Sequence, residues 1–451
     1  MWLNKNVVIL GAARQGTALT RWLVAQGARV TLSDANTQAD VSSLSDIAGK
    51  ITFALGGHPI TLLDGCDALC LSGGVPIDLP IVLEAKRRDI LLSNDSQIFF
   101  DVCAAPVTGI TGSAGKTTTT TLVGEMLNHS FRGEGRKVWV GGNIGNPLIG
   151  VAAKVRPTDF VVMELSSFQL ELMTRSPHVA CITNITPNHL DRHATMEAYA
   201  AAKKHILDFQ GAEDWAVLNA DDPVSRELVP HGHAAWFSFR QQPLGDGAWM
   251  DERGDLRVRV ASRKLDAAIC NRKDLLLMGD HNVVNVLTAA LVAGINGASA
   301  QAMGQVATTF RGVAHRLQLV SEARGAKWYD DSIATAPERL MAALRCFDQP
   351  VILLVGGRDK HLPWDEAAEL MARQCKHVIL FGEMGPMVQT HLQKDTPNTL
   401  VSTLHEAVHA AAGVVGPGDV VLLSPGGTSY DAFKDFAERG DVFTRITNYE
   451  L

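Results

Sequence analysis

The residues best suited to phosphate chemistry follow a short apolar run, Pro106 to Ile110. Small residues there precede a lysine and two threonines, in the order Gly112, Ser113, Ala114, Gly115, Lys116, Thr117 and Thr118. Glycines let backbone N–H groups curl around phosphate oxygens, and the start of a helix adds partial positive charge. The lysine suits the terminal phosphates and the first threonine suits Mg²⁺, so the segment predicts an ATP-binding loop. Because its first glycine position holds Ile110, an ordinary strand-to-helix turn is the alternative.

A second glycine-rich turn, Gly11 to Gly16, follows the first apolar run of the chain, and Asp34 follows the next such run. This order approximates the dinucleotide-binding pattern, in which glycines approach a pyrophosphate and an acid binds a ribose. Ala13 occupies the second glycine position, where it would crowd a pyrophosphate. A tight turn with no ligand is therefore the alternative.

Side chains that could bind a metal follow two apolar runs of the central region. Glu164 ends the run that starts at Phe160, which places it at the carboxyl end of a sheet beside the glycine loop, where a carboxylate can hold Mg²⁺. His189 lies in the loop after the next run, and Lys203 lies on the helix after that loop. A helix-capping glutamate, a polar histidine and a solvated lysine are the alternatives.

Further polar residues lie at helix starts and strand ends. Asn282 and Asn285 share one face of a predicted helix start, three residues apart, and could contact an adenine edge. In the last third of the chain, Arg316 and the loops 331–335, 356–360 and 424–429 carry polar residues and glycines. Loop Gly, Ser and Asp residues are usually turn formers, so each of these segments alone indicates little.

Apolar runs separated by helical patterns predict three α/β units that would position these residues, at 1–94, 95–312 and 313–451. Residues 233–269 carry short alternating runs and predict a small antiparallel excursion, whereas 317–320 and 327–329 predict a hairpin. The other strands are expected at 7–10, 29–32, 67–71, 90–93, 106–110, 160–164, 180–184, 215–219, 351–355, 377–381 and 419–423.

The composition is that of a globular protein, with 46% hydrophobic and 20% charged residues over 451 positions. The net charge of −7 provides no basic field for nucleic acid, which excludes that class of partner. Seven scattered cysteines without zinc-site spacing favour a reduced compartment. We see neither a signal segment nor an apolar run long enough for a membrane, so a cytoplasmic protein is expected.

Taken together and in this order, the motifs resemble those of the Mur ligase family. The resemblance rests on eight segments spread over all three units: T-G-S-A-G-K-T-T at 111–118, G-G-N-I-G at 141–145, E-L-S-S-F-Q-L at 164–170, N-H-L-D-R-H at 188–193, G-D-H-N-V-V-N at 279–285, A-H-R at 314–316, D-S-I-A-T at 331–335 and S-P-G-G-T-S at 424–429. It implies an N-terminal Rossmann-like domain for a UDP-substrate, a central P-loop ATPase-type parallel sheet and a C-terminal Rossmann-like domain for an amino acid.

The resemblance also implies roles for individual residues. Lys116, Glu164, His189 and Lys203 would be catalytic, with Lys203 carbamylated and Thr117, Glu164, His189 and Lys203 binding metal. The nucleotide would contact the glycine loop together with Asn282, Asn285, Arg316 and Asp331. Substrates would contact Gly11, Asp34, Ser72, Gly73, Asn143, Thr335, Lys360, Ser429 and Phe436. Two positions depart from the family pattern, because Asn188 stands where an aspartate is frequent and Ile333 where a lysine is frequent.

A carboxylate does not react with an amine in water at a useful rate, so such a ligase uses ATP to form an acyl-phosphate. The resemblance implies that UDP-N-acetylmuramoyl-L-alanine and D-glutamate are joined with two Mg²⁺ ions, giving ADP and phosphate. This places the chain in peptidoglycan synthesis, and hence in cell-wall growth, cell shape and cell division. We expect the chain to be a monomer. The alternatives are an L-glutamate-adding or other ligase of the same family, and a non-catalytic P-loop nucleotide-binding regulator.

Overall fold

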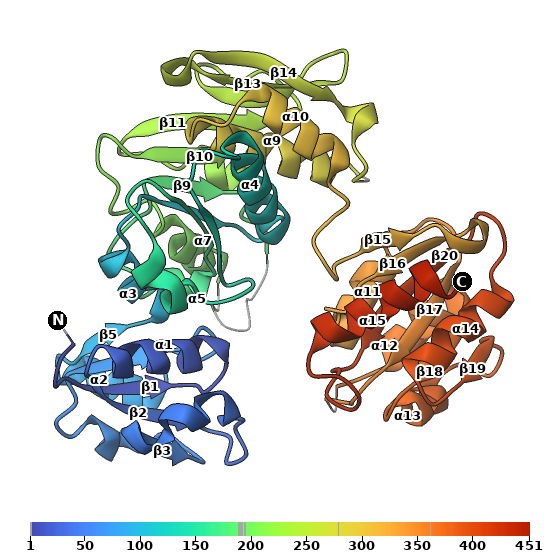
Figure 1. Cartoon of the computed structure of the whole chain (residues 1–451), viewed down its shortest axis with the longest axis horizontal. Helices are drawn as coiled ribbons and strands as arrows, with labels where there is room; N and C mark the ends of the chain where they lie inside the picture. The colour runs from blue at the N-terminus through green and yellow to red at the C-terminus, as the bar shows by residue number, and fades with distance from the viewer. Residues whose placement is uncertain (1, 188–192, 194, 278, 361) are drawn as a thin grey trace. The chain divides into compact units, whose positions relative to one another are not determined.

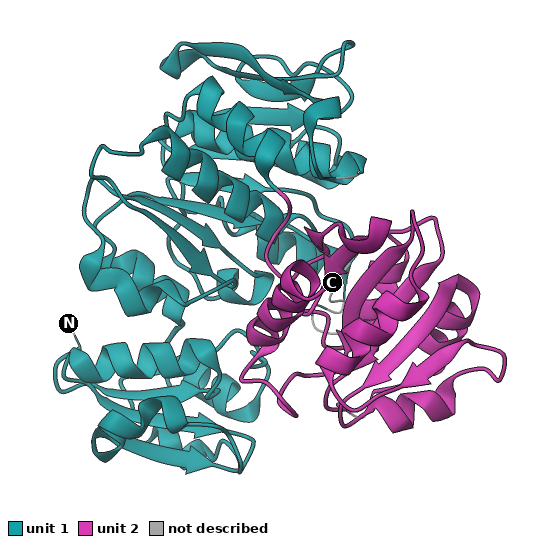
Figure 2. Cartoon of the chain, turned by 45° about the vertical axis from the view of Figure 1, so that its right-hand side comes forward, with its two compact units in different colours: residues 1–310 teal, residues 311–451 magenta. Residues whose placement is uncertain are grey.

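A computed structural model describes every residue of the chain except 1, 188–192, 194, 278 and 361. The chain forms two compact units, Met1–Phe310 and Arg311–Leu451 (Figure 2). Over the described residues it contains three sheets, two in the first unit and one in the second (Figure 1). Among the described helices, none combines the length and the hydropathy that a membrane crossing requires.

The first sheet is parallel and has the strand order β3-β2-β1-β4-β5. Alternate residues of β1 face opposite sides: Val7 and Ile9 share a core with α1, whereas Val8 and Leu10 share one with α2. The expected strands are confirmed, and the half-exposed edge strand β3 was missed. The elements are β1 (Asn6–Leu10), α1 (Arg14–Ala25), β2 (Arg29–Asp34), η1 (Ser42–Lys50), β3 (Ile51–Leu55), η2 (Ile60–Leu63), β4 (Ala68–Leu71), α2 (Pro80–Arg87) and β5 (Leu91–Ser93).

The second sheet has the order β14-β13-β12-β11-β10-β9-β6-β8-β7. Its strands are β6 (Val107–Thr111), β7 (Val138–Gly142), β8 (Phe160–Glu164), β9 (Val179–Ile182), β10 (Trp215–Asn219), β11 (His233–Ser238), β12 (Gly247–Met250), β13 (Asp255–Val260) and β14 (Leu265–Asn271). The predicted antiparallel excursion at 233–269 is wrong in part. β11 pairs parallel to β10 and β12 pairs parallel to β11, so the antiparallel pairs of this region are β12–β13 and β13–β14. The alternation of apolar and polar residues correctly predicted strands in this region, but the direction of each strand depends on the neighbouring strand with which it pairs.

Helix α4 opens at the glycine loop and packs against α9 (Figure 1). From Val283 onward α9 is buried on almost every side, as expected for a helix that is apolar all round. One hydrophobic cluster joins the first two sheets, because it includes Ile9 of β1, Phe99 of α3 and Met163 of β8. The helices around the second sheet are α3 (Asp95–Val102), α4 (Lys116–Ser130), η3 (Leu148–Lys154), α5 (Ser167–Leu170), α7 (Met196–Lys204), α8 (Pro223–Arg226), η4 (Ala261–Arg263), η5 (Arg272–Asp274), α9 (Asp280–Ile295) and α10 (Ala300–Thr309).

The second unit contains the third sheet, in the order β15-β16-β20-β17-β18-β19. The expected hairpin is confirmed as the antiparallel pair β15–β16, and the remaining strands are parallel. Alternate residues of β17 divide between a core with α11 and α12 and a core with α14 and α15. The elements are β15 (Gln318–Ser321), η6 (Ala323–Gly325), β16 (Lys327–Asp330), α11 (Pro337–Leu344), β17 (Val351–Gly356), α12 (Asp365–Gln374), β18 (Cys375–Phe381), α13 (Gly385–His391), β19 (Asn398–Leu400), α14 (Leu404–Val414), β20 (Val420–Gly426) and α15 (Phe436–Tyr449).

The α/β class with three mainly parallel sheets is therefore confirmed. In open parallel sheets, ligands bind outside the carboxyl ends of the strands, next to the strand where the order reverses. All three sheets bring polar loops to that edge.

Candidate functional site

The predicted ATP-binding loop joins the carboxyl end of β6 to the first turn of α4. Gly112 (φ +147°) and Gly115 (φ +82°) take backbone conformations that L side chains rarely adopt. A Cβ atom at Gly112 would lie 1.9 Å from Thr183 Oγ1, and one at Gly115 would lie 2.3 Å from Asn285 Oδ1. Both glycines are therefore required by the backbone conformation and by the close approach of neighbouring segments.

Residues after β9 fix this loop from the neighbouring strand. Ser113 N donates to Asn184 O (2.9 Å) and Ala114 N donates to Asn184 Oδ1 (3.0 Å). Thr183 Oγ1 donates to Ala114 O at 2.6 Å. From α7, Tyr199 Oη donates to Ser113 Oγ at 3.1 Å. Asn184 ends the strand expected at 180–184 and Tyr199 lies on the helix expected to carry Lys203, but their contact with the loop requires elements that are distant in the chain.

Two lysines converge on one carbonyl of the loop. Lys116 Nζ donates to Gly112 O at 2.8 Å and to Ser113 O at 3.2 Å. Lys203 Nζ, from α7, also donates to Gly112 O at 2.8 Å. Thr117 and Thr118 lie half-buried in the first turn of α4. The structure thus brings Lys203 to the ATP-binding loop, and the alternative of a solvated helix lysine is wrong because the side chain is only 2% exposed.

The environment of Lys203 opposes a positive charge. Burial and the nearby charge of Lys116 lower the pKa of Lys203 to about 7, although Glu164 acts in the opposite direction. The pKa of an unperturbed lysine is about 10.4, so the neutral amine of Lys203 is much more accessible than usual. The Lys203 ammonium also lies 4.6 Å from the centre of the Tyr199 ring.

Glu164 ends β8 and is 2% exposed. Its Oε1 accepts a hydrogen bond from Asn143 Nδ2 at 2.8 Å, while its Oε2 is buried and has no hydrogen-bond partner among the described residues. A buried carboxylate oxygen without a donor is costly unless it meets a cation. This carboxylate therefore fits a divalent metal, and the alternative of a helix-capping glutamate is wrong because Ser166 caps α5.

The other metal ligand predicted for the central region, His189, belongs to the segment after β9. His189 and Asn188 lie outside the described residues. His193 is described and buried: its Nε2 is 2.9 Å from Ser167 Oγ and its ring stacks on Phe168 with centroids 5.3 Å apart. His193 therefore packs against Ser167 and Phe168 of α5.

The two asparagines predicted to contact adenine lie in the first turns of α9. Asn285 Nδ2 donates to Asn282 Oδ1 at 3.1 Å, so the two amides share one face as expected. The close approach of Asn285 to Gly115 brings this face to the ATP-binding loop. The structure thus unites Asn282, Asn285 and the loop within the first unit.

The predicted substrate residues of the first sheet also meet. Ser72 Oγ, after β4, donates to Gly11 O after β1 at 3.0 Å. Gly73 N donates to Gln15 Oε1 at 2.9 Å, and Ala12 N donates to Asp34 Oδ2 at 2.7 Å. The two loops follow adjacent strands where the strand order reverses, which is the expected place for a nucleotide.

This first loop also contacts the second sheet. Arg14 Nη1 donates to Gly145 O at 2.8 Å, in the loop that follows β7 and contains Asn143. Because Asn143 in turn holds Glu164, a continuous line of contacts runs from the Gly11 loop to the carboxylate beside the ATP-binding loop. Asn94, at the start of α3, strengthens the same junction by donating from Nδ2 to Gln169 O at 2.8 Å.

In the second unit, polar residues collect at the carboxyl ends of β16 and β20. Ser424 Oγ donates to Asp331 Oδ2 at 2.9 Å, and Leu317 N donates to Asp331 Oδ1 at 3.2 Å. Burial raises the pKa of Asp331 to about 7, more than the hydrogen bond from Ser424 lowers it. Lys360 Nζ donates to Thr335 Oγ1 at 3.1 Å, so two residues predicted to contact the amino acid lie together.

The other two predicted substrate residues lie next to a residue that the sequence analysis missed. Arg439 is fully buried and donates to Ser332 Oγ (2.9 Å), Ser332 O (2.9 Å) and Gly427 O (3.1 Å). It therefore ties together the loops after β16 and β20, while Phe436 O accepts from Ser332 Oγ (2.8 Å) and Ser429 is buried nearby in sequence. The sequence offered one signal for this role: Arg439 lies four residues before Phe443, which places it on the buried face of α15.

Arg316 lies on a turn of unusual backbone. His315 (φ +61°) and Leu317 (φ +44°) on either side adopt the left-handed conformation, and Arg316 is exposed. His315 Nδ1 is 2.7 Å from Asp330 Oδ2, and this hydrogen bond raises the pKa of His315 although burial lowers it. The pair holds the turn so that Arg316 points away from the core of the second unit.

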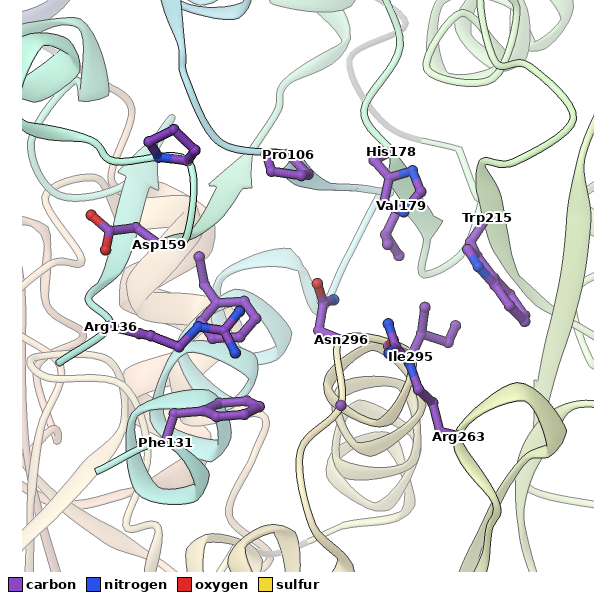
Figure 3. Close-up of a pocket in the computed structure, with 13 residues that line it drawn as sticks. Pro106, Phe131, Arg136, Asp159, His178, Val179, Trp215, Arg263, Ile295 and Asn296 are labelled. Carbon is purple, nitrogen blue, oxygen red and sulfur yellow. The ribbon is translucent and has the colours of Figure 1, made fainter. Parts of the chain in front are cut away.

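A separate pocket of about 380 Å³ lies at the opposite edge of the second sheet (Figure 3). Phe160, Val179 and Trp215 line it where their strands begin, and Arg136 covers the Phe160 ring at 4.2 Å. Of the predicted site residues that the structure describes, none lines this pocket. The candidate chemistry therefore lies at the carboxyl edge of the sheet and the pocket at its amino edge.

Comparison with known families matches the chain in three places. Residues 5–93 match the family described as Mur ligase MurD-like, N-terminal domain, and residues 110–293 match Mur ligase middle domain. Residues 315–427 match Mur ligase, glutamate ligase domain. These matches cover the ATP-binding loop, Glu164, Lys203 and the polar edge of the third sheet.

Curated proteins match over nearly the whole chain. A UDP-N-acetylmuramoylalanine–D-glutamate ligase from Acetivibrio thermocellus is 40% identical, covering 99% of this chain and 96% of that protein. One from Symbiobacterium thermophilum is 41% identical, with 98% of each covered. Among solved structures, the UDP-N-acetylmuramate-alanine ligase from Thermotoga maritima superposes with a TM-score of 0.58 at 19% identity, covering 99% of this chain and 100% of that one. At that identity the superposition shows a shared fold.

Proposed function

The chain belongs to the Mur ligase family, and on that premise we propose that it is an ATP-dependent ligase that joins D-glutamate to UDP-N-acetylmuramoyl-L-alanine in peptidoglycan synthesis. The observation that carries this function is identity of 40–41% over nearly the full length to two curated ligases of that specificity. The convergence of Lys116, Lys203 and Glu164 at one sheet edge supports the chemistry.

The reaction has two steps. A carboxylate oxygen of the alanine residue attacks the γ-phosphorus of ATP, the bond to the β–γ bridging oxygen breaks, and ADP leaves. The amino group of glutamate then attacks the acyl-phosphate carbon, loses a proton and expels phosphate, which leaves the new amide. Lys116, in the first turn of α4, would offset the charge of the transferred phosphoryl group.

Mg²⁺, when bound, would neutralise phosphate charge and polarise the transferred group. We propose that Thr117, Glu164, His189 and Lys203 hold two such ions. The buried Oε2 atom of Glu164 supports the proposed metal site, because it has no hydrogen-bond partner in the described part of the chain. Asn143 donates to the other oxygen of Glu164 and would orient the carboxylate. We propose that Asn143 also contacts the muramoyl substrate.

We further propose that Lys203 is carbamylated. The neutral amine would attack CO₂ and release a proton, giving a carbamate that carries one negative charge. Burial beside Lys116 favours the neutral amine, and a carbamate oxygen is a suitable Mg²⁺ ligand, whereas an ammonium would repel the metal. The amine that now donates to Gly112 O would thus become a negatively charged group able to bind Mg²⁺.

The remaining ligand assignments are proposals based on the polar edges. Gly11, Asp34, Ser72 and Gly73 would bind the UDP group on residues 1–94. Residues 95–312 would bind ATP. The phosphates would contact the loop residues Gly112, Ser113, Ala114, Gly115, Lys116, Thr117 and Thr118. The adenine would contact Asn282 and Asn285. On residues 313–451, Arg316 and Asp331 would contact the nucleotide, and Thr335, Lys360, Ser429 and Phe436 would bind glutamate. We also propose that the chain acts in the cytoplasm as a monomer.

The direct test is ADP release from the purified chain with ATP and Mg²⁺, adding UDP-N-acetylmuramoyl-L-alanine and D-glutamate singly and together. Rapid ADP release is expected only with both. Preference for L-glutamate would assign the chain to the other glutamate branch. Slow ATP hydrolysis that neither co-substrate alters would instead identify a P-loop regulator and contradict the ligase function.

A further inference from the structure

Two histidines and a glutamate of the second unit, none of them predicted as site residues, meet on its surface. His405 and His409 are one helical turn apart on α14, and Glu450 caps the end of α15. His405 Nε2 lies 2.7 Å and His409 Nε2 lies 3.5 Å from the same oxygen, Glu450 Oε2. The two imidazole rings have centroids 4.5 Å apart.

We propose that His405, His409 and Glu450 form a binding site for a divalent transition metal such as Zn²⁺. Their donor atoms all lie within 4.8 Å of one another. In a tetrahedral Zn²⁺ site, ligands about 2.0 to 2.2 Å from the metal lie roughly 3.4 Å apart. Small rotations of exposed side chains would therefore convert the present hydrogen-bonded cluster into a ligand set, and two nitrogens with one carboxylate oxygen suit Zn²⁺, Ni²⁺ or Cu²⁺.

The helices that carry the ligands are firmly held. Leu404, Ala407 and Val408 on the other face of α14 are buried in the core that also contains Phe443 and Ile446 of α15. The histidines thus project from a fixed helix, at the i and i+4 spacing that places two imidazoles on one face. Both helices pack into this core, and sites built on helices hold a more defined metal geometry than sites on loops.

The local sequence His405-Glu406-Ala407-Val408-His409 has the spacing in which a helical glutamate of a metallopeptidase acts as a base. Glu406 is not available for that role here, because its Oε2 accepts from Ser402 N (2.8 Å) and Thr403 N (3.3 Å) in the capping box of α14. We therefore infer metal binding that joins α14 to the end of α15, with water completing the coordination, rather than hydrolysis.

A simple ion pair is the competing explanation of this cluster. Two positively charged imidazoles around one carboxylate would give the same distances without any metal. The two explanations differ in what added Zn²⁺ does. A metal site predicts saturable binding that requires both histidines, and stabilisation of the folded chain as Zn²⁺ is added.

The test is calorimetric titration of ZnCl₂ into the full-length chain with excess Mg²⁺, which keeps the proposed catalytic metal site filled. Cys346→Ser serves as the background, because this exposed thiol is itself a zinc ligand. We expect one Zn²⁺ per chain, and about tenfold or greater weakening in His409→Ala and in Glu450→Gln. Saturating Zn²⁺ should also raise the Tm by several degrees, and His409→Ala should abolish that shift.

His391→Ala is the matched control. His391 Nδ1 lies 3.3 Å from Asp365 Oδ1, so it is an exposed histidine paired with one carboxylate and no second imidazole. This variant should bind Zn²⁺ as the background does. With Cu²⁺ in place of Zn²⁺, electron paramagnetic resonance should show two nitrogen ligands in the background and one in His409→Ala. Unchanged Zn²⁺ affinity in His409→Ala, or no saturable binding in the background, would overturn the site. The ADP-release rate of His409→Ala should match wild type, which separates this site from the ligase reaction.

Discussion

Lys116 and Lys203 donate hydrogen bonds to the same backbone oxygen, Gly112 O, each at 2.8 Å. Two ammonium groups sharing one acceptor repel each other, and burial adds to this effect at Lys203. The pair therefore divides its roles, with Lys116 suited to a permanent charge for phosphates and Lys203 suited to chemistry of the neutral amine.

Lys116→Ala should abolish ADP release, with a loss in kcat of about 10²- to 10³-fold or more, because the charge facing the phosphates is removed. Binding of UDP-N-acetylmuramoyl-L-alanine, measured by calorimetry, should stay near wild type, since Gly11, Ser72 and Gly73 belong to a different sheet. A parallel loss of affinity for the UDP-substrate would contradict the assignment of two separate phosphate sites.

Lys203→Ala should be nearly inactive, and acetate should restore part of the rate by supplying the missing carboxylate oxygens. Rescue by a carboxylate distinguishes a carbamate from a structural lysine. The matched control is Lys204→Ala, because Lys204 is the next residue of α7 and its exposed Nζ pairs with Asp208 at 2.8 Å. Wild-type activity in Lys203→Ala, or rescue by a neutral amide such as acetamide equal to that by acetate, would sink the carbamate proposal.

Glu164→Gln should raise the Mg²⁺ concentration needed for half-maximal ADP release, because a neutral amide binds Mg²⁺ more weakly than a carboxylate. Activity should recover partly at high Mg²⁺, since Asn143 can still orient the side chain through a hydrogen bond. Glu134→Gln alters an exposed glutamate just after α4 and should leave the Mg²⁺ dependence unchanged. An unchanged Mg²⁺ requirement in Glu164→Gln would exclude Glu164 as a ligand.

Because the carboxyl group of Asp95 is buried, the free energy of unfolding of the first unit should fall as pH rises. Burial raises the pKa of Asp95 to about 7, more than Ser96 N–H and Gln169 lower it. Between the ordinary aspartate pKa near 4 and this value, the folded chain keeps a proton that the unfolded chain releases, so unfolding becomes more favourable with increasing pH. Below about pH 4 the penalty is absent, and above about pH 7 it is complete.

The size of this effect can be isolated by comparing variants. From about pH 5 to pH 8 the contribution of Asp95 to the free energy of unfolding should fall by roughly 2 to 3 kcal/mol. Denaturant titrations of Asp95→Asn should lack this part of the pH dependence, whereas exposed Asp78→Asn should retain it. Identical pH profiles for wild type and Asp95→Asn would show that the pKa is not raised.

Arg439→Lys should raise the KM for glutamate more than it lowers kcat. A lysine cannot reproduce the forked donors that join Ser332 to Gly427, so the loops after β16 and β20 should become less well positioned. Unfolding of the second unit should also become easier by about 2 to 4 kcal/mol. Arg445→Lys, at an exposed position of the same helix, should leave both quantities unchanged. Equal effects of the two substitutions would contradict a positioning role for Arg439.

Much of the architecture followed from local patterns. Apolar runs such as Phe160 to Glu164 and Trp215 to Asn219 matched β8 and β10 at both ends, because a buried parallel strand needs a short continuous apolar segment. The direction of β11 and β12 did not follow, because it depends on the neighbouring strands with which they pair. The existence of β3 did not follow either, because this half-exposed edge strand pairs with β2 and lacks a continuous buried apolar run.

By itself, the sequence determined that Gly112, Lys116 and Glu164 lie at strand ends, because strand, turn and helix signals are local and parallel strands expose their carboxyl ends together. Only the tertiary structure decided that Lys203 reaches the carbonyl of Gly112 and that Arg439 joins two loops. These relationships depend on how α7 and α15 pack on their sheets. Burial and the meeting of like charges arise when distant elements pack together, and no local pattern records them.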